Sequence, residues 1–418
     1  MTLLEELRWR GLVYDVINEE ELEKRLEEKP ITLYCGFDPT ADSLHIGHLV
    51  PIITLMRFHR AGHRVIALVG SGTGLVGDPS GKKTERAMND EETVRRWSEV
   101  FKEQIRRFLP LDGKTAFCLD NYQWLGGMRA LDLLRDYGRH FSVNIMLAKE
   151  SVKTRLEAGL TYLEFSYMIM QSIDFLKMYQ HPDLHCEMQI GGQDQWGNIT
   201  SGIDLIRKIE GPEAKAYALT MPLVLKSDGT KFGKTESGTV WLDAKKTTPY
   251  ELYQFFLNTA DADVVKFLKY YTFLSKEEIE ELEKEVQTAP HLRAAQKALA
   301  REIVTLVHGE EAYLQAKKVS EALFSGNIKD LNVEEIGLGF RDVPSLEVEG
   351  DVNIIDCLVD VGAAVSKREA REFLKNGAVT VNGEIVKDFE YVVSKANAVG
   401  GHYTVIRRGK KNYYLIKH

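Results

Sequence analysis

Short apolar runs alternate with amphipathic stretches over residues 1–220. Residues 31–37, 64–70, 115–119 and 184–190 are apolar runs that predict buried strands, and residues 49–60, 91–108, 163–179 and 194–209 predict helices. Glycine-rich turns lie between them, as in a parallel sheet whose strands are joined by crossover helices. The fold class expected here is α/β, with a Rossmann-like parallel sheet.

The pattern changes twice further along the chain. From 248 to 323 it becomes helical, with Lys- and Glu-rich faces and apolar positions three or four apart. Residues 325–351 are rich in glycine and have little periodicity, which indicates a linker, and a small α+β unit follows. We therefore expect domains at 1–220 and 221–324, a linker at 325–351, and a last domain at 352–418.

Composition is that of an ordinary globular protein, with 44% hydrophobic and 28% charged residues among 418. No apolar run approaches the roughly 20 residues that a membrane span needs. The segment from Met1 to Arg10 lacks the apolar core of a signal peptide. Four widely spaced cysteines favour a reducing cytoplasm over a disulfide framework or a zinc site.

Charge is distributed unevenly. Residues 352–418 hold 11 Lys and Arg against 7 Asp and Glu, a net charge of +4, so the rest of the chain carries −12 of the total of −8. A basic end on an acidic body suggests a polyanionic partner for that end. An ordinary solvated surface would also carry such a surplus.

Two histidines and a glycine, His45, Gly47 and His48, lie where the first strand ends and a helix begins. Backbone N–H groups and the helix dipole favour anions at such a position, and ligands of open α/β sheets bind at that edge. This segment fits a nucleotide site. It fits equally well a helix capped by Ser43 with two surface histidines.

A second glycine-rich stretch, residues 72–77, matches G-x-G-x-x-G after a strand. Pro79 and Gly81 then predict a longer loop where a dinucleotide-binding motif would open a helix, and the spacing excludes a Walker A loop. Asp78, Lys82 and Arg86 make this loop suited to the ammonium of one ligand and the phosphates of another.

A third loop, residues 226–235, alternates lysine with glycine around Lys231 and Lys234 and ends at Thr235. Such a loop can close over a triphosphate and neutralise its charge. Taken alone, it is explained more simply as a solvated basic hairpin.

Tyr167, Gln171 and Asp174 recur at i, i+4 and i+7 of the helix predicted over 163–179 and therefore share one face. Apolar residues surround this row, which favours a lined pocket over a solvent-facing stripe. Residues 191–198 form another polar loop after a strand, where a substrate would lie. His181 and His185 have no further ligands nearby in sequence, so we assign them to structure and expect no metal site.

These motifs together resemble a known family. His45-Ile46-Gly47-His48 matches the HIGH signature of class I aminoacyl-tRNA synthetases, and Lys231-Phe232-Gly233-Lys234-Thr235 resembles their KMSKS signature in the form found in bacterial tyrosyl-tRNA synthetases. The segment 34–38, the loop 77–82, the Tyr167 row and 194–198 also look like that family. The stretches 366–371, 376–379 and 381–383 resemble an S4 RNA-binding domain. The resemblance covers essentially the whole chain.

The resemblance implies activation of tyrosine by ATP and transfer of tyrosyl to the 3′-terminal adenosine of its tRNA. It also implies a catalytic domain (1–220), a KFGKT loop with a helical domain (221–324) and an S4-like RNA-binding domain (352–418). The tyrosine site would comprise Tyr34 and Asp174 at the phenol, Asp78, Tyr167 and Gln171 at the ammonium, and also Asp38 and Gln195. The reacting phosphates would meet Thr40, His45, Lys82, Arg86, Lys231, Lys234 and Thr235. The remaining ATP contacts would come from Cys35, Gly36, Gly47, His48, Gly192 and Asp194. If relatives use a hydroxyl at the position of Pro51, this chain lacks that contact.

For tRNA, the residues implied are Arg207 and Lys208 on the body and Arg368, Arg371, Lys410 and Lys411 in the tail, with Tyr413 and Tyr414 as stacking surfaces for bases. The family also implies a homodimer in the cytoplasm, no membrane partner, and Mg²⁺ carried with ATP.

Three alternatives compete with this interpretation. A tryptophanyl-tRNA synthetase would share the fold, but the Tyr34 and Asp174 pair and the S4-like tail argue against it. A HIGH-type nucleotidyltransferase would be far shorter and lack the tail. A non-catalytic RNA-binding protein would be expected to have degraded signatures, and both are whole here.

Overall fold

The computed structural model describes residues 1–82, 88–230, 232–235, 238–325, 327–341, 343–409 and 412–418, and for Lys234 and Thr235 the backbone alone. The chain forms two compact units. The first comprises residues 1–246 and 259–295, and the second comprises residues 247–258 and 296–418.

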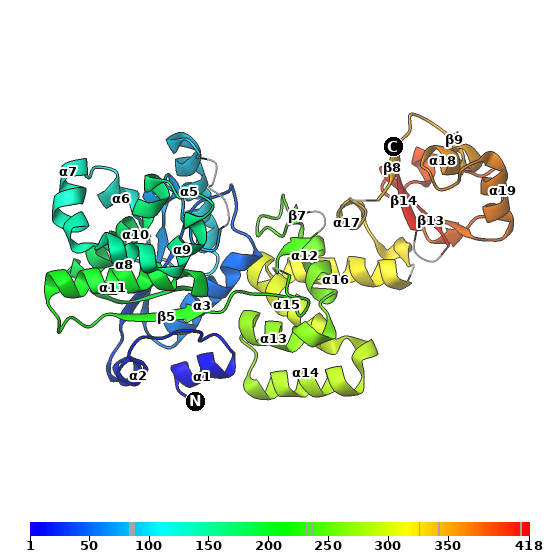
Figure 1. Ribbon diagram of the computed structural model, residues 1–418. Coiled ribbons are helices and arrows are strands. Elements are labelled where there is room, and N and C mark those ends of the chain that lie inside the picture. The colour runs from blue at the N-terminus through cyan, green and yellow to red at the C-terminus, as the bar shows by residue number, and fades with distance from the viewer. Residues whose placement is uncertain (83–87, 231, 236–237, 326, 342, 410–411) are drawn as a thin grey trace. The chain divides into compact units, whose positions relative to one another are not determined.

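The first unit is built on a five-stranded parallel sheet in the order β3-β2-β1-β4-β5. The edge strand β5 is labelled in Figure 1. Its strands are β1 (Thr32–Phe37), β2 (Arg64–Val69), β3 (Ala116–Asp120), β4 (Cys186–Gly192) and β5 (Tyr217–Met221). The four predicted strands are confirmed to within two residues at each end, whereas β5 was missed. Because the chain leaves β1 toward β2 on one side and β4 lies on the other, the strand order reverses at β1, which is where ligands of such sheets bind.

Helices cover both faces of this sheet, which explains why β1, β2 and β3 are largely apolar. Tyr34, Ile66 and Leu68 join one core with α10 (Tyr162–Gln180) and α11 (Trp196–Glu210). Strand positions of the other parity point to the opposite face, where α3 (Leu49–Arg60) and α5 (Glu91–Ile105) pack against β2. All four helices match predicted ones.

The loop that matched G-x-G-x-x-G contains a single helical turn, α4 (Ser71–Gly74), and has no further helix up to residue 82. This agrees with the argument from Pro79 and Gly81. The remaining helices of the first unit are α1 (Leu3–Trp9), α2 (Glu19–Glu28), α6 (Tyr122–Leu125), α7 (Ala130–Asp132), α8 (Val143–Ala148), α9 (Glu150–Leu156), α13 (Asp261–Tyr271) and α14 (Lys276–Thr288).

The second unit contains helices and a mixed sheet in the order β11-β10-β13-β14-β8. Its strands include β8 (Ser345–Glu347), β9 (Val352–Asn353), β10 (Val379–Val381), β11 (Glu384–Ile385), β12 (Val392–Val393), β13 (Tyr403–Arg408) and β14 (Asn412–Lys417). Its helices include α12 (Pro249–Leu257), α15 (Ala294–His308) from Gln296 onward, α16 (Glu310–Ser325), α17 (Val333–Gly339), α18 (Ile354–Asp360) and α19 (Lys367–Lys375).

The segment 325–351, expected as a linker, contains α17 and β8. Strand β8 pairs in parallel with β14, from Ser345 opposite Leu415 to Glu347 opposite Lys417. Ile336 and Phe340 of this segment are buried in one core with Val405 and Leu415. Within the described parts of the chain, no helix combines the length and apolarity needed to span a bilayer.

Candidate active site

A cavity of about 310 Å³ lies at the carboxyl ends of the strands, beside β1 and β4. Its volume falls at the lower end of the range of small-molecule sites. Most predicted tyrosine and ATP positions line it, namely Tyr34, Cys35, Gly36, Asp38, Thr40, His45, Gly47, His48, Asp78, Tyr167, Gln171, Asp174, Gly192, Asp194 and Gln195. Residues that are up to 161 positions apart in sequence therefore share one cavity, because parallel strands end at the same edge.

A phenolic hydroxyl and a carboxyl group are buried in this cavity, those of Tyr34 and Asp174. Tyr34 is 1% exposed, and its hydroxyl has no hydrogen-bond partner among the described residues. Asp174 is 2% exposed and accepts hydrogen bonds from Asn121 Nδ2 at 3.0 Å and Trp124 Nε1 at 2.7 Å. Burial raises the pKa of Asp174 to about 8 and raises the pKa of Tyr34 well above its usual value.

Asn121 and Trp124 were missed by the sequence reasoning. Both follow β3, at the same sheet edge as the loops that were recognised, and that position is the signal that could have found them. They fix the orientation of the Asp174 carboxyl from a segment 50 residues away in sequence.

Asp38 links the cavity wall to α10. Its Oδ2 accepts the hydroxyl of Tyr167 at 2.6 Å, and its Oδ1 accepts the hydroxyl of Thr73 at 2.7 Å. Thr73 in turn accepts a hydrogen bond from Asn121 at 2.9 Å, so one network joins Asp38 to Asp174. Gly70 must be glycine here, because a Cβ would lie 2.0 Å from Asp38 Oδ1.

A second polar group surrounds Asp78. Its Oδ2 accepts from Gln195 Nε2 at 2.6 Å, and its Oδ1 accepts the backbone N–H of Ser80 at 2.9 Å. Asn198 Nδ2 also donates to Asp78, Ser80 and Gln195 at 3.2–3.4 Å. This side chain at the start of α11 holds the predicted ammonium ligand and was not assigned that role from the sequence.

Two glutamine carbonyl oxygens in the cavity are buried acceptors without a partner in the described chain, Oε1 of Gln171 on α10 and Oε1 of Gln189 on β4. A buried acceptor without a donor costs free energy, so both oxygens favour a ligand that donates hydrogen bonds. Gln189 is a further cavity residue that the sequence reasoning missed.

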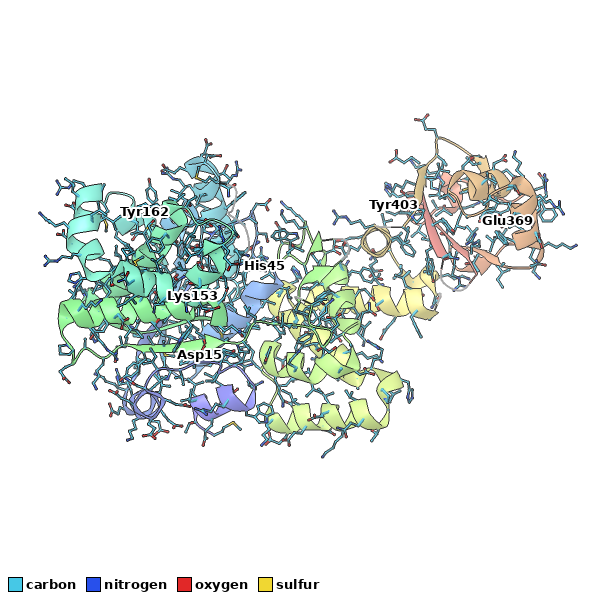
Figure 2. All side chains as sticks on the ribbon, viewed as in Figure 1. Asp15, His45, Lys153, Tyr162, Glu369 and Tyr403 are labelled. Atoms are coloured by element: carbon cyan, nitrogen blue, oxygen red, sulfur yellow. The ribbon has the colours of Figure 1, made fainter. Side chains whose placement is uncertain are left out.

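His45, labelled in Figure 2, and His48 form a compact turn just before α3. The backbone N–H of Gly47 donates to His45 Nδ1, and that of His45 donates to His48 Nδ1, both at 3.1 Å. An Nδ1 that accepts is unprotonated, so each neutral ring carries its proton on Nε2. The rings stack with centroids 3.9 Å apart, and a Cβ on Gly47 would lie 2.9 Å from the His45 ring.

The alternative of a helix capped by Ser43 is wrong. The buried Ser43 hydroxyl donates to the Leu44 carbonyl and accepts from Gln104 Nε2, while His45 caps the first turn. Pro51 lies in the first turn of α3 and lines the cavity, where its missing N–H costs little.

The third predicted loop is joined by backbone hydrogen bonds to the HIGH segment. Val240 N–H donates to the carbonyl of Gly233, and Ile46 N–H donates to the carbonyl of Val240. Gly233 has a φ of +88°, which favours glycine, and a Cβ there would meet Ile46 at 2.3 Å. The two signatures, about 190 residues apart in sequence, therefore lie side by side.

The predicted phosphate ligands differ in how far the structure describes them. Lys82 follows α4, and its N–H donates to the Pro79 carbonyl at 3.2 Å. Lys234 and Thr235 form the short strand β6 (Lys234–Thr235). The side chains of Lys234 and Thr235 lie outside the described part of the chain. Arg86, Lys231, Lys410 and Lys411 lie outside it entirely.

The predicted tRNA residues that are described lie at the surface of their own units. Arg207 and Lys208 lie in the last turn of α11, and the Lys208 ammonium donates to the His140 carbonyl at 2.6 Å. Arg368 and Arg371 are exposed on α19, the helix that carries Glu369, which is labelled in Figure 2.

The interpretation of Tyr413 and Tyr414 as base-stacking surfaces is wrong for Tyr414. Its side chain is buried in the core of the second unit, because alternate residues of β14 point inward. Tyr413 is half-buried, with its hydroxyl donating to the Leu323 carbonyl and its ring packed edge-on against Phe340.

His185 Nδ1 lies 3.2 Å from the Tyr179 carbonyl. In the described ranges, no group of three or more His, Cys, Asp or Glu side chains is arranged to hold a metal. All four cysteines are free.

The family follows from comparison with known proteins. A family model described as tRNA synthetases class I (W and Y) matches residues 26–325. The chain belongs to this family. A second model, the C-terminal domain of tyrosine–tRNA ligases, matches residues 335–416 of this synthetase.

Relatives of this synthetase match it over its full length. The tyrosine–tRNA ligase of Geobacillus stearothermophilus is 58% identical over 421 residues, covering 100% of both chains. Tyrosine–tRNA ligase 1 of Bacillus subtilis is 55% identical, covering 99% of each. Among solved structures, a C-terminally truncated mitochondrial tyrosyl-tRNA synthetase of Aspergillus nidulans is 31% identical with a TM-score of 0.69, covering 77% of this chain and 94% of that one.

Proposed function

We propose that the cavity binds L-tyrosine with its phenol at Tyr34 and Asp174. The observation that carries this proposal is the pair of buried groups itself, the Tyr34 hydroxyl and the Asp174 carboxyl. A phenolic hydroxyl can both donate and accept and so can match both groups at once. An indole N–H can only donate, and phenylalanine offers neither, so both would leave a buried polar group unmatched.

The α-ammonium of tyrosine is assigned to Asp78, Tyr167 and Gln171. The carboxylate of Asp78 is held by Gln195 and Asn198, and Oε1 of Gln171 is an acceptor with no donor in the described structure. An ammonium supplies three donors and a positive charge, which suits this group of acceptors. Asp38 and Gln195 support the site by fixing Tyr167 and Asp78.

The activity is that of a tyrosine–tRNA ligase, an ATP-dependent enzyme. In the first step, a carboxylate oxygen of tyrosine attacks the α-phosphorus of ATP. The new O–P bond gives tyrosyl-adenylate, and the α–β phosphoanhydride bond breaks to release pyrophosphate. Because the nucleophile is already ionised, the step needs no general base, and catalysis rests on positioning and on stabilising phosphate charge. In the second step, a ribose hydroxyl of the tRNA 3′-terminal adenosine attacks the tyrosyl carbonyl. The new ester bond forms, the C–O bond between the tyrosyl carbonyl and the phosphate breaks, and AMP and the hydroxyl proton are released.

ATP is assigned to the side of the cavity formed by the HIGH segment. His45 and His48, with ring protons on Nε2, act as neutral donors and packing surfaces and not as acids or bases. The positions assigned to the adenosine and ribose are Cys35, Gly36, Gly47, His48, Gly192 and Asp194, all in the cavity wall. The phosphates are assigned to Thr40, His45, Lys82, Arg86, Lys231, Lys234 and Thr235.

Mg²⁺ is proposed to arrive on the phosphates of ATP. This ion keeps several waters and is usually held by substrate phosphates with one or two carboxylates. The Asp78 oxygens already accept hydrogen bonds from Gln195, Ser80 and Asn198, which suits an ion held mainly by the nucleotide. When bound, the ion would neutralise charge that develops on the leaving pyrophosphate.

The tRNA is assigned to Arg207 and Lys208 for the acceptor arm and to Arg368, Arg371, Lys410 and Lys411 in the basic C-terminal part. Exposed cations that recur on one helix, as on α19, fit phosphate contacts. We assign residues 1–220 to catalysis, 221–324 to the KFGKT loop and helical domain, and 352–418 to RNA binding, with 325–351 connecting them.

A homodimer in the cytoplasm is proposed from surface chemistry. Seven large apolar side chains are exposed between residues 131 and 162, including Leu131, Ile145 and Tyr162, the last of which is labelled in Figure 2. Exposed apolar side chains concentrated in one stretch of the chain favour a protein interface, provided that they form one patch. Sedimentation equilibrium giving the 47.4 kDa mass of one chain at micromolar concentration would contradict a dimer.

The proposed cytoplasmic location is supported by the cysteines. All four are free, as expected in a compartment that keeps thiols reduced.

Amino-acid-dependent exchange of pyrophosphate into ATP tests the proposed function. We expect exchange with tyrosine and none above background with tryptophan. Phenylalanine should be rejected by about 10⁵, which is the known discrimination of a tyrosyl-tRNA synthetase that works without editing. Exchange driven equally by tryptophan, or by no amino acid, would refute the assignment of the cavity.

Tyrosine binding should strengthen as pH rises from 6 toward 8. Asp174 has a pKa of about 8, raised by burial against the opposing effect of Asn121 and Trp124. A phenol that donates to the carboxylate favours its ionised form, so the pKa falls on binding and a proton is released. The affinity should rise by up to about tenfold per pH unit below pH 8. Equilibrium dialysis with Asp174→Asn as control checks this, and an equal slope in the two proteins would contradict it.

A further inference from the structure

Helix α13 holds the loop that carries the second signature. Asp263, in its first turn, accepts the backbone N–H and the hydroxyl of Ser227 on Oδ2, both at 3.1 Å. Lys266 donates to the Leu225 carbonyl at 2.7 Å and to Asp263 Oδ1 at 3.2 Å. The first two turns of α13 therefore fix residues 225–227, just before the glycine-rich turn of the loop.

The same face of α13 also fixes the other side of the loop. Asp263, Phe267 and Tyr271 are spaced at i, i+4 and i+8 and share one helix face. The Phe232 ring packs against Phe267 with centroids 4.3 Å apart and against Tyr271 at 5.7 Å. Phe232 is buried, and its neighbours in sequence are Lys231 and Gly233.

The segment between these two contacts is a short hairpin with its own hydrogen bonds. Phe232 N–H donates to the Val224 carbonyl, and Lys226 N–H donates to the Thr230 carbonyl. Asp228 Oδ1 accepts the N–H of Thr230 at 2.8 Å. Both ends of the hairpin are thus fixed to α13. Beyond Phe232, backbone hydrogen bonds join Gly233 to Val240 and Val240 to Ile46 of the HIGH segment.

Asp263 is 3% exposed and does not line the cavity. Burying a carboxylate is costly unless its oxygens are matched, and this one is matched by Ser227 on the loop and by Lys266, which itself binds the loop. A hydrophobic residue would hold a loop on a helix without that cost. A carboxylate that accepts two hydrogen bonds from one residue fixes its position and orientation more closely.

We propose that Asp263 is a positioning residue for adenylate formation, which sets the backbone of residues 225–227 on α13 so that the lysines of the KFGKT segment reach the ATP phosphates. The inference rests on the proposed function, because it takes Lys231 and Lys234 as phosphate ligands. Asp263 acts through the loop and touches neither tyrosine nor ATP.

The test is a double-mutant cycle between Asp263→Ala and Lys234→Ala, read by single-turnover formation of tyrosyl-adenylate. Asp263→Ala should slow this step by about 10- to 100-fold, with tyrosine affinity in the absence of ATP unchanged. In the Lys234→Ala background the same change should cost less than about threefold, because the group that Asp263 positions is already gone. Asp263→Asn, which keeps one acceptor oxygen, should recover most of the rate. Glu281→Ala, an exposed carboxylate change on α14, is the matched control and should have no effect.

Equal losses in both backgrounds would overturn the proposal and leave Asp263 with a purely structural role. If Asp263→Ala does not fold, Ser227→Ala is tested in its place. Ser227 is exposed, and its change to alanine removes the hydroxyl that donates to Asp263 but keeps the backbone N–H donor. It should slow adenylate formation by about three- to tenfold in the wild-type background and have no effect with Lys234→Ala. Failure of the wild-type protein to form an adenylate with tyrosine would instead refute the proposed function, so the two failures are distinguishable.

Discussion

Asp174→Ala should lower kcat/KM for tyrosine in pyrophosphate exchange by about 10³, mainly through KM, with the KM for ATP unchanged. The change removes the acceptor of the phenolic hydroxyl and leaves Asn121 Nδ2 and Trp124 Nε1 without an acceptor at this position. In the complex, tyrosine loses a hydrogen bond to a charged acceptor, worth about 1.5–3 kcal/mol, and its buried hydroxyl is left unmatched at a cost of about 1–3 kcal/mol, so about 4 kcal/mol in sum corresponds to the expected factor.

Asp174→Asn is the matched variant because it keeps the shape and one acceptor oxygen. It should fall between wild type and Asp174→Ala in tyrosine kinetics and should relax discrimination against phenylalanine. Thermal unfolding separates lost recognition from lost structure, because the donors Asn121 Nδ2 and Trp124 Nε1, left without their acceptor, lower the unfolding midpoint whether or not tyrosine is present. Unchanged tyrosine kinetics in a folded Asp174→Ala protein would remove Asp174 from recognition of the phenol.

Deletion of residues 325–418 should leave tyrosine activation within about threefold of wild type and abolish charging of tRNA. All residues that line the cavity lie between positions 34 and 232, so the deletion removes none of them. It removes Arg368 and Arg371 with the rest of the basic C-terminal part, and phosphate contacts supply much of the affinity for nucleic acid. Pyrophosphate exchange and aminoacylation, measured on the same preparation, check the two halves of this prediction.

The deletion also uncovers Val319 and Ala322, which share a core with Ile336 and Phe340, so a second variant guards against misfolding. Arg368→Glu with Arg371→Glu in the full chain changes exposed side chains alone. It should raise the KM for tRNA by at least about tenfold and reduce the salt dependence of binding, while exchange is unchanged. Lys276→Glu with Lys284→Glu on α14 makes the same change of charge elsewhere. Normal charging by both the truncated protein and the arginine variant would refute the assignment of tRNA binding to this part.

The cavity shows why local patterns predicted so many of its positions. Strands β1 to β3 are largely apolar because helices cover both faces of the sheet, and such runs are visible in a sequence. Strand β4 carries Glu187 and Gln189 between its apolar residues. The i, i+4, i+7 spacing of Tyr167, Gln171 and Asp174 placed them on one helix face, and all three line the cavity. Strand β5 (Tyr217–Met221) was missed although Gly211-Pro212 marks a turn before it, because the strand has five residues and Thr220 is its single β-branched one.

Other cavity residues could not be inferred, because their roles depend on contacts between distant segments. Asn121 and Trp124 orient Asp174 across about 50 residues of sequence, and Thr73 joins Asp38 to Asn121. Tyr414 follows Tyr413 in sequence, yet the pleat of β14 buries one and leaves the other partly accessible. Nothing in the local sequence distinguishes these outcomes.

The sequence by itself determined the α/β class, the strands β1 to β4, the two signatures and the set of side chains that could hold tyrosine and ATP, because these depend on periodicity and on short motifs. The tertiary structure alone decided which of those side chains are matched and which are left with an open hydrogen-bonding atom. The Tyr34 hydroxyl and Gln171 Oε1 have no partner in the described residues, whereas Asp174, Asp38 and Asp78 are each oriented by neighbours. Local pattern sets which groups reach the sheet edge, but the pairing of buried polar groups depends on which distant segments the fold brings within hydrogen-bond distance.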